Sequence, residues 1–162
     1  QKAIPLDEKE TGGSLFDKLS ALGGSMILST LKGLENGTIT RTPQGESGTS
    51  YAKMLTKEMG HIDWTKDAVS IERLVRGLNP WPSAYTRLDG KTLKIWRANV
   101  LPDEKKAAPG CIIKAEKGSF LVQTGDGVLE LLEVQLEGKK RMTTDAFLNG
   151  YTVEEGTYFT RG

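Results

Sequence analysis

The 162-residue sequence is short of the side chains that most often build reactive centres, with one cysteine, Cys111, and one histidine, His61. A single cysteine excludes an internal disulfide and is typical of a protein from the reducing cytoplasm. One cysteine and one histidine do not supply the ligands of a zinc site, so we expect no bound metal. No apolar run approaches the roughly 18 residues that cross a bilayer. We therefore expect a soluble protein without a membrane partner.

Neither scarce residue predicts catalysis. Cys111 lies in the apolar run 110–113, where aliphatic neighbours disfavour the reactive thiolate. His61 lies in the short segment 60–64, which ends in Trp64, and a structural or surface role is favoured for it. The sequence begins at Gln1 rather than Met, so we expect it to be a fragment.

The net charge is only +1, but the basic residues are concentrated. Between residues 73 and 97, one acidic residue, Asp89, accompanies six basic ones: Arg73, Arg76, Arg87, Lys91, Lys94 and Arg97. The local charge is therefore 6 − 1 = +5. A second concentration consists of Lys139, Lys140 and Arg141. Such clusters bind phosphates by releasing counterions, although a charge run can also be a solvated face without a ligand. The patch favours nucleic-acid binding only if its members share one surface.

Hydrophobic periodicity predicts two helices before any strand. Apolar residues at helical spacing predict a helix over 14–35, with Ser14 and Asp17 capping its start. A second helix over 66–78 has capping oxygens on Asp63 and Thr65 and ends before Pro80. The segment 36–60 between them has the composition of a linker. The first helix has no covering partner nearby in sequence, so it should dock elsewhere, dimerise or fray.

Beyond residue 82 the apolar period changes from helical to alternating, which predicts strands. Five are expected, punctuated by glycine turns: 84–88, 93–101, 111–116, 119–124 and 128–136. The inward face of the last strand changes parity between Leu131 and Leu132, which predicts a β-bulge. Short, coiled strands favour a mainly β fold, a small OB-like barrel. A short helix over 143–150 and an edge strand over 156–162 complete the prediction.

Two short motifs need an explanation. In Asn79-Pro80-Trp81-Pro82, two prolines fix φ on either side of an aromatic residue, so we expect an extended backbone with Trp81 buried in the core. The segment 124–127 contains two glycines that could suggest a phosphate loop. It lies between two β-patterned runs, so it predicts a hairpin turn.

These motifs also resemble a known family. The run 79–85, together with 60–64 (Gly-His-Ile-Asp-Trp) and 124–127 (Thr-Gly-Asp-Gly), resembles the carboxy-terminal half of methionyl-tRNA formyltransferases. These enzymes formylate the methionine of initiator tRNA, with 10-formyltetrahydrofolate as the co-substrate. The resemblance implies that residues 1–35 end a catalytic domain, 36–60 form a linker, and 61–162 form an OB-like tRNA-binding domain.

The resemblance implies a binding role for this chain rather than catalysis. The catalytic residues and the folate cleft belong to an amino-terminal domain whose motifs are absent here, so we expect no catalytic residue and no cofactor. The expected partners are initiator methionyl-tRNA and the missing catalytic domain, in a monomeric parent protein. The candidate nucleic-acid-binding residues are Arg73, Arg76, Arg87, Lys91, Lys94, Arg97, Lys139, Lys140, Arg141, Lys53 and Lys57.

Other interpretations keep the same fold. Formyltransferases that act on nucleotide sugars and hydrolases that act on formyl-folate carry related carboxy-terminal domains. A third alternative is a purely structural module that braces the catalytic domain and binds no RNA.

Overall fold

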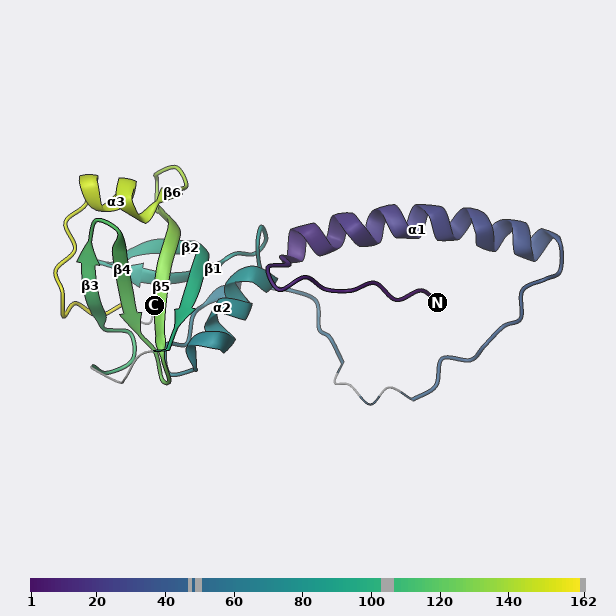
Figure 1. The fold of residues 1–162 in the computed structure, drawn as a ribbon, viewed down its shortest axis with the longest axis horizontal. Coiled ribbons are helices and arrows are strands. Elements are labelled where there is room, and N and C mark those ends of the chain that lie inside the picture. The colour runs from purple at the N-terminus through teal and green to yellow at the C-terminus, as the bar shows by residue number, and fades with distance from the viewer. Residues whose placement is uncertain (47, 49–50, 103–106, 161–162) are drawn as a thin grey trace.

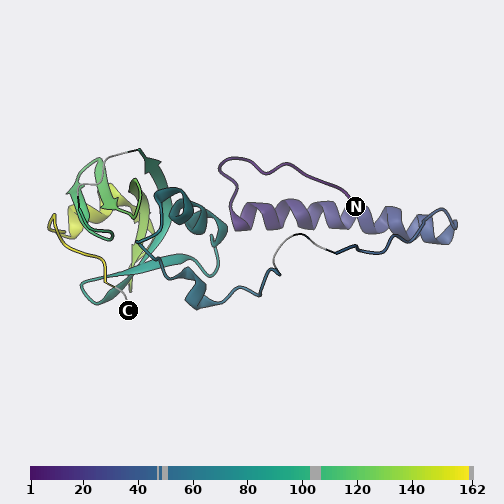
Figure 2. The ribbon, with the colours of Figure 1, turned by 90° about the horizontal axis from the view of Figure 1, so that it is seen from below.

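The computed structural model describes residues 1–46, 48, 51–102 and 107–160, and it has two parts of different packing. The strands gather with two helices in a β-domain (residues 61–160), while a long helix extends away from it in both views (Figures 1 and 2). The linker (residues 36–60) returns from the far end of this helix and ends in a 3₁₀ turn, Lys57–Gly60. The predicted linker and edge strand also cover residues 47, 49–50 and 161–162, which lie outside the described residues. Within the described ranges, none of the helices is both long and apolar enough to cross a membrane.

The long helix, α1, spans Gly12–Glu35, and none of its residues is buried. The sequence prediction placed its start at Ser14, which is two residues late. Thr11 is the N-cap, and its hydroxyl accepts a bond from the Ser14 amide while Ser14 Oγ accepts one from the Thr11 amide. Ser14 therefore occupies the third helical position of a reciprocal cap.

The shorter helix, α2, spans Ala68–Gly77 and packs against the sheet. Its N-cap is Asp67, whose Oδ1 accepts a 2.7 Å bond from the Ser70 amide. The predicted capping residues instead close the preceding turn, where Asp63 Oδ1 accepts bonds from the amide and hydroxyl of Thr65. Four residues of α2 are buried: Ala68, Ile71, Glu72 and Val75.

The five predicted strands are present, with ends that differ from the prediction by at most two residues. In spatial order they are β1 (Ala84–Leu88), β2 (Lys91–Leu101), β5 (Val128–Leu136), β4 (Ser119–Gln123) and β3 (Ile112–Glu116), all antiparallel. The sequence did not reveal β6 (Met142–Thr143), which pairs with β5. The helix α3, Thr144–Gly150, follows directly and lies over one end of the sheet (Figure 1). The fold is mainly β, as predicted.

The predicted bulge in β5 is confirmed. Arg97 pairs with Glu133, and the next residue, Ala98, pairs with Leu131, so Leu132 has no partner opposite it. On β2, Trp96 is skipped in the same way. The inward side chains are Leu129 and Leu131 before this point and Val134 and Leu136 after it. The irregularity keeps the core face apolar and leaves Trp96 and Leu132 only partly buried.

The carboxy-terminal tail connects the two edges of the sheet. The Thr160 amide donates to the carbonyl of Arg87 in β1, and the Phe159 amide donates to the carbonyl of Gly110 just before β3. One residue before Phe159, Tyr158 pairs with Cys111. The sheet itself is open, with β1 and β3 at its opposite edges, and the tail bridges these edges through isolated pairs. Phe159 is buried and stacks on Trp64, with ring centroids 5.2 Å apart.

The expectation for Trp81 was wrong, because its side chain is 55% exposed. Residues 78–82 form a tight turn rather than an extended segment, and both Asn79-Pro80 and Trp81-Pro82 are cis peptides. The Ser83 amide closes the turn by donating to the Leu78 carbonyl at 2.9 Å. Leu78 and Pro82 are the buried apolar members of this turn, and Trp81 points away from the core.

Candidate nucleic-acid interface

The structure divides the six basic residues between 73 and 97 into three groups. Arg76, Lys94 and Arg97 lie near the bulge, where they meet Arg141 from the second cluster. Arg87 and Lys91 flank the β1–β2 turn at the other end of the hairpin. Arg73 is exposed on α2, on the side of Asp67. The six residues come from α2, β1 and β2, and Lys94 shares a neighbour, Glu137, with Arg87 and Lys91.

Arg76 and Arg97 from this first group, together with Arg141, line a hollow of about 570 Å³, which is the candidate site (the hollow). One wall comes from the segment before α1 (the lead-in, residues 1–11), and the others come from α2, β2, β5 and the approach to β6. Four of its side chains are cationic and one is anionic, so its net charge is 4 − 1 = +3. The cations are Lys9, Arg76, Arg97 and Arg141, and the anion is Glu72. Thr11, Asn79 and Asn99 add polar groups, and Trp96, Ala98 and Leu132 add apolar surface.

Trp96 organises the basic side chains beside the bulge. The Arg141 guanidinium lies 5.0 Å from the centroid of the indole ring, and Lys94 Nζ lies 5.7 Å from it, which is the range of cation–π attraction. The ring is fixed because Trp96 Nε1 donates a 3.2 Å bond to Gln135 Oε1. Arg141 is also held by Glu133. The contact between Lys94 and Trp96 could be predicted from the sequence, because residues two apart on a strand point to the same face.

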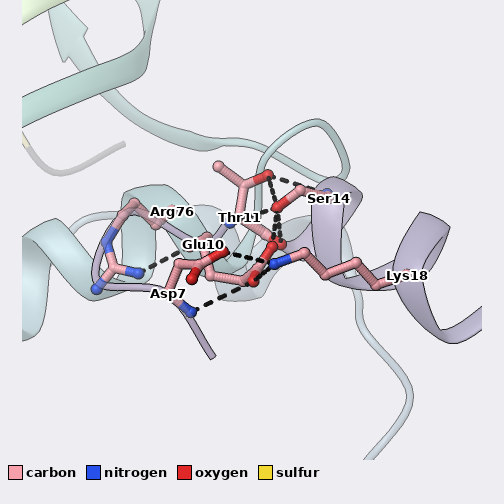
Figure 3. Close-up of polar contacts among 6 residues, drawn as sticks. All are labelled: Asp7, Glu10, Thr11, Ser14, Lys18 and Arg76. Carbon is pink, nitrogen blue, oxygen red and sulfur yellow. Dashed lines mark hydrogen bonds and ion pairs between the residues drawn. The ribbon is translucent and has the colours of Figure 1, made fainter. Parts of the chain in front are cut away.

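Arg76 is the most committed of the four cations. Its Nε donates to Glu72 Oε1 at 2.6 Å. Its Nη1 donates to the backbone carbonyl of Glu10 at 2.7 Å, and Figure 3 shows this second bond. Glu72, the acid that neutralises Arg76, stands one position before the basic stretch 73–97. Only part of this guanidinium is left for a ligand.

Arg87 and Lys91 face an acidic neighbour as well. Glu137 Oε2 accepts a 2.9 Å bond from the Thr92 amide, and this bond lowers the pKa of the Glu137 carboxyl, with Arg87 and Lys91 adding to the effect. The pair therefore presents less net positive charge than its sequence position suggests.

The remaining predicted residues lie on exposed segments. Lys139 and Lys140 occupy the turn between β5 and β6, next to Arg141. Lys53 lies in the irregular part of the linker, and Lys57 begins the 3₁₀ turn that ends it. No contact joins these four lysines to the hollow among the described residues.

The start of α1 is fixed to the turn 78–82 and to the end of α2 by a set of close contacts (the junction). The Gly13 amide donates a 2.8 Å bond to the Asn79 carbonyl. Gly13 has no room for a side chain, because a Cβ there would be 2.8 Å from Pro80 Cδ, and a Cβ on Gly12 would overlap the Gly77 carbonyl oxygen. Glycine therefore allows the two backbones to meet.

The Glu10 side chain strengthens the junction from within. Its Oε2 lies 2.5 Å from Lys18 Nζ, and its Oε1 accepts a bond from Ser14 Oγ (Figure 3). These bonds, first to Lys18 and then to Ser14, lower the pKa of the Glu10 carboxyl. Lys18 also pairs with Asp7 at 2.6 Å, and bonds to the two carboxylates raise the pKa of its amine.

The two residues considered for catalysis have structural surroundings. The His61 ring packs edge-on against Tyr85, with centroids 5.5 Å apart, and Cys111 is buried. Among the described residues, no three His, Cys, Asp or Glu side chains gather where they could hold a metal ion. The arrangement at the hollow offers hydrogen-bond donors, positive charge and an aromatic ring, which are means of binding.

Comparisons with known proteins agree on the fold. Residues 54–152 match the family model described as formyl transferase, C-terminal domain. The chain is 54% identical over 160 residues to a methionyl-tRNA formyltransferase from Agathobacter rectalis, with 99% of this chain and 52% of that protein covered. It is 49% identical over 158 residues to the one from Lachnospira eligens, with 94% of this chain and 50% of that protein covered. The chain thus spans about half the length of the curated relatives it matches.

A solved structure shows the same fold at lower identity. A variant of HypX from Aquifex aeolicus superposes over 98% of this chain and 31% of its own, with a TM-score of 0.61 and 19% identity. The superposition includes nearly all of the chain, so the β-domain and the preceding segments have a counterpart in a longer protein.

Proposed function

Because the chain belongs to the formyl transferase C-terminal domain family, we propose that its β-domain holds methionyl-tRNA by the phosphate backbone while a domain outside this chain transfers the formyl group. The observation that supports this most is the basic surface around Trp96. Lys94 and Arg141 contact its ring, and the hollow beside it carries a net charge of +3. Arginine binds phosphate through paired donors, and phosphate contacts position a nucleic acid without reading its sequence.

The proposal extends to the reaction of the longer protein. Its substrates would be 10-formyltetrahydrofolate and initiator methionyl-tRNA, and its catalytic groups would lie in the amino-terminal half. The described residues of this chain offer no acid–base pair at the hollow beyond Arg76 and Glu72, which bond each other. We therefore assign the chain a binding role and no turnover of its own. This role would place the protein in the cytoplasm, where initiator tRNA is used.

The domain boundaries form part of the proposal. Residues 1–35 would end the catalytic domain, 36–60 would be the linker, and 61–162 would be the tRNA-binding domain. The exposed apolar side chains of α1 would then pack on the preceding part of the longer protein: Phe16, Leu19, Ile27, Leu28, Leu31 and Leu34. The absence of buried residues on a 24-residue helix supports this assignment.

Filter binding of the chain to unfractionated tRNA across a salt series tests the proposal. Three to six phosphate contacts would give weak binding with a log–log salt slope of about −0.9 per contact. A double variant, Lys94→Ala with Arg141→Ala, should weaken binding and flatten the slope. The matched control removes one lysine and one arginine elsewhere, Lys32→Ala with Arg41→Ala, and should bind as the parent chain does.

The same experiment separates the alternatives. If the parent chain binds no tRNA at any salt concentration, the domain is a structural brace or serves a formyltransferase that acts on another substrate. Initiator and elongator tRNAs should bind equally well, because phosphate contacts carry no sequence information. Selection of the initiator would then belong to the amino-terminal half.

A further inference from the structure

The hollow has a feature that the general basic surface lacks, because its walls belong to two segments that are far apart in the sequence. Lys9 and Thr11 come from the lead-in, while Arg97 and Asn99 come from β2. Among the described residues, the lead-in is bonded to the β-domain through Arg76 and the Glu10 carbonyl, and the first turn of α1 is bonded to it through the Gly13 amide and the Asn79 carbonyl. A ligand in the hollow would therefore touch both segments at once.

Two of the four cations are free to bind it. Arg76 is bonded to Glu72 and Glu10, and Arg141 is bonded to Glu133. Lys9 and Arg97 are both exposed, and neither side chain makes a hydrogen bond or ion pair with any described residue. The uncommitted charges thus come from two different walls, one from the lead-in and one from β2.

The size and lining of the hollow indicate more than a bare phosphate. Its volume of about 570 Å³ falls within the 300–1,000 Å³ typical of small-ligand pockets. Trp96 and Leu132 supply an apolar surface next to the cations. A nucleotide fits this combination, since its phosphate needs cations and its sugar and base need an apolar or aromatic wall.

We propose that the hollow binds one nucleotide unit, with its phosphate between Lys9 and Arg97, and that this binding fixes the start of α1 to the β-domain. The proposal rests on the proposed function in taking the nucleotide to belong to RNA. A ligand that binds only when the two walls are together favours that arrangement by its binding energy. The coupling is reciprocal, so a loosened junction should also weaken ligand binding.

The binding test uses the full chain and three probes, which are unfractionated tRNA, AMP and inorganic phosphate. The double variant Lys9→Ala with Arg97→Ala should bind tRNA more weakly, with a salt slope reduced by about 0.9 for each phosphate that the variant no longer binds. The control pair, Lys32→Ala with Arg41→Ala, removes the same charges outside the hollow and should retain the parent slope. Binding of AMP but not tRNA would assign the site to a free nucleotide, and binding of phosphate alone with equal affinity would remove the need for the Trp96 wall.

The outcomes distinguish the two proposals. If the parent chain binds no tRNA, the proposed function fails. If the parent chain binds tRNA, and Lys9→Ala with Arg97→Ala binds it as well as the control pair does, tRNA contacts the basic surface elsewhere and the hollow is not its site. Circular dichroism of each variant confirms folding, and we expect it to be unchanged because Lys9 and Arg97 are exposed.

Hydrogen exchange tests the second part of the proposal. The Gly13 amide bonds to Asn79 across the junction, so its exchange rate reports opening there. Added tRNA should slow this exchange in the parent chain and in the control pair, but not in Lys9→Ala with Arg97→Ala. The Ile112 amide, which donates a 2.8 Å bond to the Thr157 carbonyl outside the lining of the hollow, serves as an internal reference. Equal slowing in both double variants would show that the ligand does not bridge the two walls.

Discussion

The two longer helices of this molecule have similar apolar patterns and very different surroundings. The 10-residue α2 buries four residues against the sheet, including Ile71 at 2% exposure. The 24-residue α1 buries none, and Ile27 at its centre is 53% exposed. Figure 1 shows the same contrast, with α2 lying along the β-domain and α1 extending away from it.

The difference shows what an amphipathic pattern establishes. Periodicity predicts that a helix has an apolar face, but it does not say whether the covering partner belongs to the same chain. For α2 the main partner is β2, which follows α2 in the same chain after the short strand β1. For α1, the described residues offer caps and the junction at one end, and the relatives are about twice as long as this chain. Packing energy therefore stabilises α2 here, while α1 depends on local interactions.

Replacing the same residue on each helix tests this difference most strongly. Ile71→Ala should lower the free energy of unfolding by about 2–5 kcal/mol, because it leaves a cavity between α2 and the sheet. Ile27→Ala should change it by no more than about 0.5 kcal/mol, since its side chain is already largely exposed to solvent. Urea denaturation followed by tryptophan fluorescence reports on the β-domain, because the three tryptophans, at 64, 81 and 96, lie outside α1. Circular dichroism at the same urea concentrations also detects the loss of α1, so the two signals together measure both substitutions.

A large loss of stability for Ile27→Ala would contradict the comparison. It would mean that the apolar face of α1 is covered in solution, for instance by a second copy of the chain. Sedimentation of the parent chain at several concentrations would then identify the dimer.

The fold was largely predictable because its strands and turns follow local rules. Five strand ranges agree with the prediction within two residues, since glycines at positive φ mark turns such as those at Gly90, Gly118 and Gly127. The bulge was visible as a change of parity at Leu132. The short strand β6 was not predictable, because two residues carry no period and the pairing depends on β5.

The site was less predictable, because it depends on contacts between distant segments. A window of sequence placed Arg76 and Arg87 in one cluster, but α2 and the hairpin direct them to different places. Lys9 joins the hollow from a lead-in that has no periodic pattern of its own. The error for Trp81 has a similar origin, since residue type favours burial while the turn at 78–82 directs the ring outward.

A substitution at the junction can separate α1 from the β-domain without changing the core of the β-domain. Gly12→Ala would push a Cβ into the Gly77 carbonyl, and such overpacking costs about 1–3 kcal/mol. We expect the junction to open, so that the Gly13 amide exchanges roughly tenfold to a hundredfold faster, while the urea midpoint of the β-domain stays the same. Gly23→Ala is the matched control, because no atom lies within 4 Å of its Cβ position. It should stabilise α1 by about 0.5–1 kcal/mol and slow amide exchange there.

Acid should affect the two parts through different carboxylates. Bonds from the Ser70 side chain and amide lower the pKa of Asp67 below its ordinary value of 3.8. A carboxyl with a lowered folded-state pKa stabilises the fold above its unfolded pKa, and this contribution is lost as the pH falls through the folded value. The urea concentration at the unfolding midpoint should therefore decrease as the pH is lowered below about 4. Asp67→Asn should flatten this decline, because asparagine remains a good N-cap and does not titrate there.

Glu10 gives the corresponding test at the junction. Its pKa is lowered by Lys18 and Ser14, so the same sign applies, and protonation in acid should release these bonds. The expected result is a lower protection of the Gly13 amide, relative to its intrinsic exchange rate at each pH, without a change in the β-domain midpoint. A shift of that midpoint in Glu10→Gln would show that the junction contributes to the stability of the whole chain.

The smallest effect is expected for Trp81, and it sharpens the comparison between buried and exposed aromatic residues within the β-domain. Trp64 is 6% exposed, stacks on Phe159 and donates a 3.1 Å bond to Thr86, so Trp64→Ala should cost about 3–5 kcal/mol. Trp81 is 55% exposed, and Trp81→Ala should change the free energy of unfolding by about 0.5 kcal/mol. Urea denaturation followed by circular dichroism measures both without relying on the fluorescence that the substitutions remove. A cost for Trp81→Ala comparable to that of Trp64→Ala would mean that the ring is covered in solution, and that the turn at 78–82 packs against more of the chain than the start of α1.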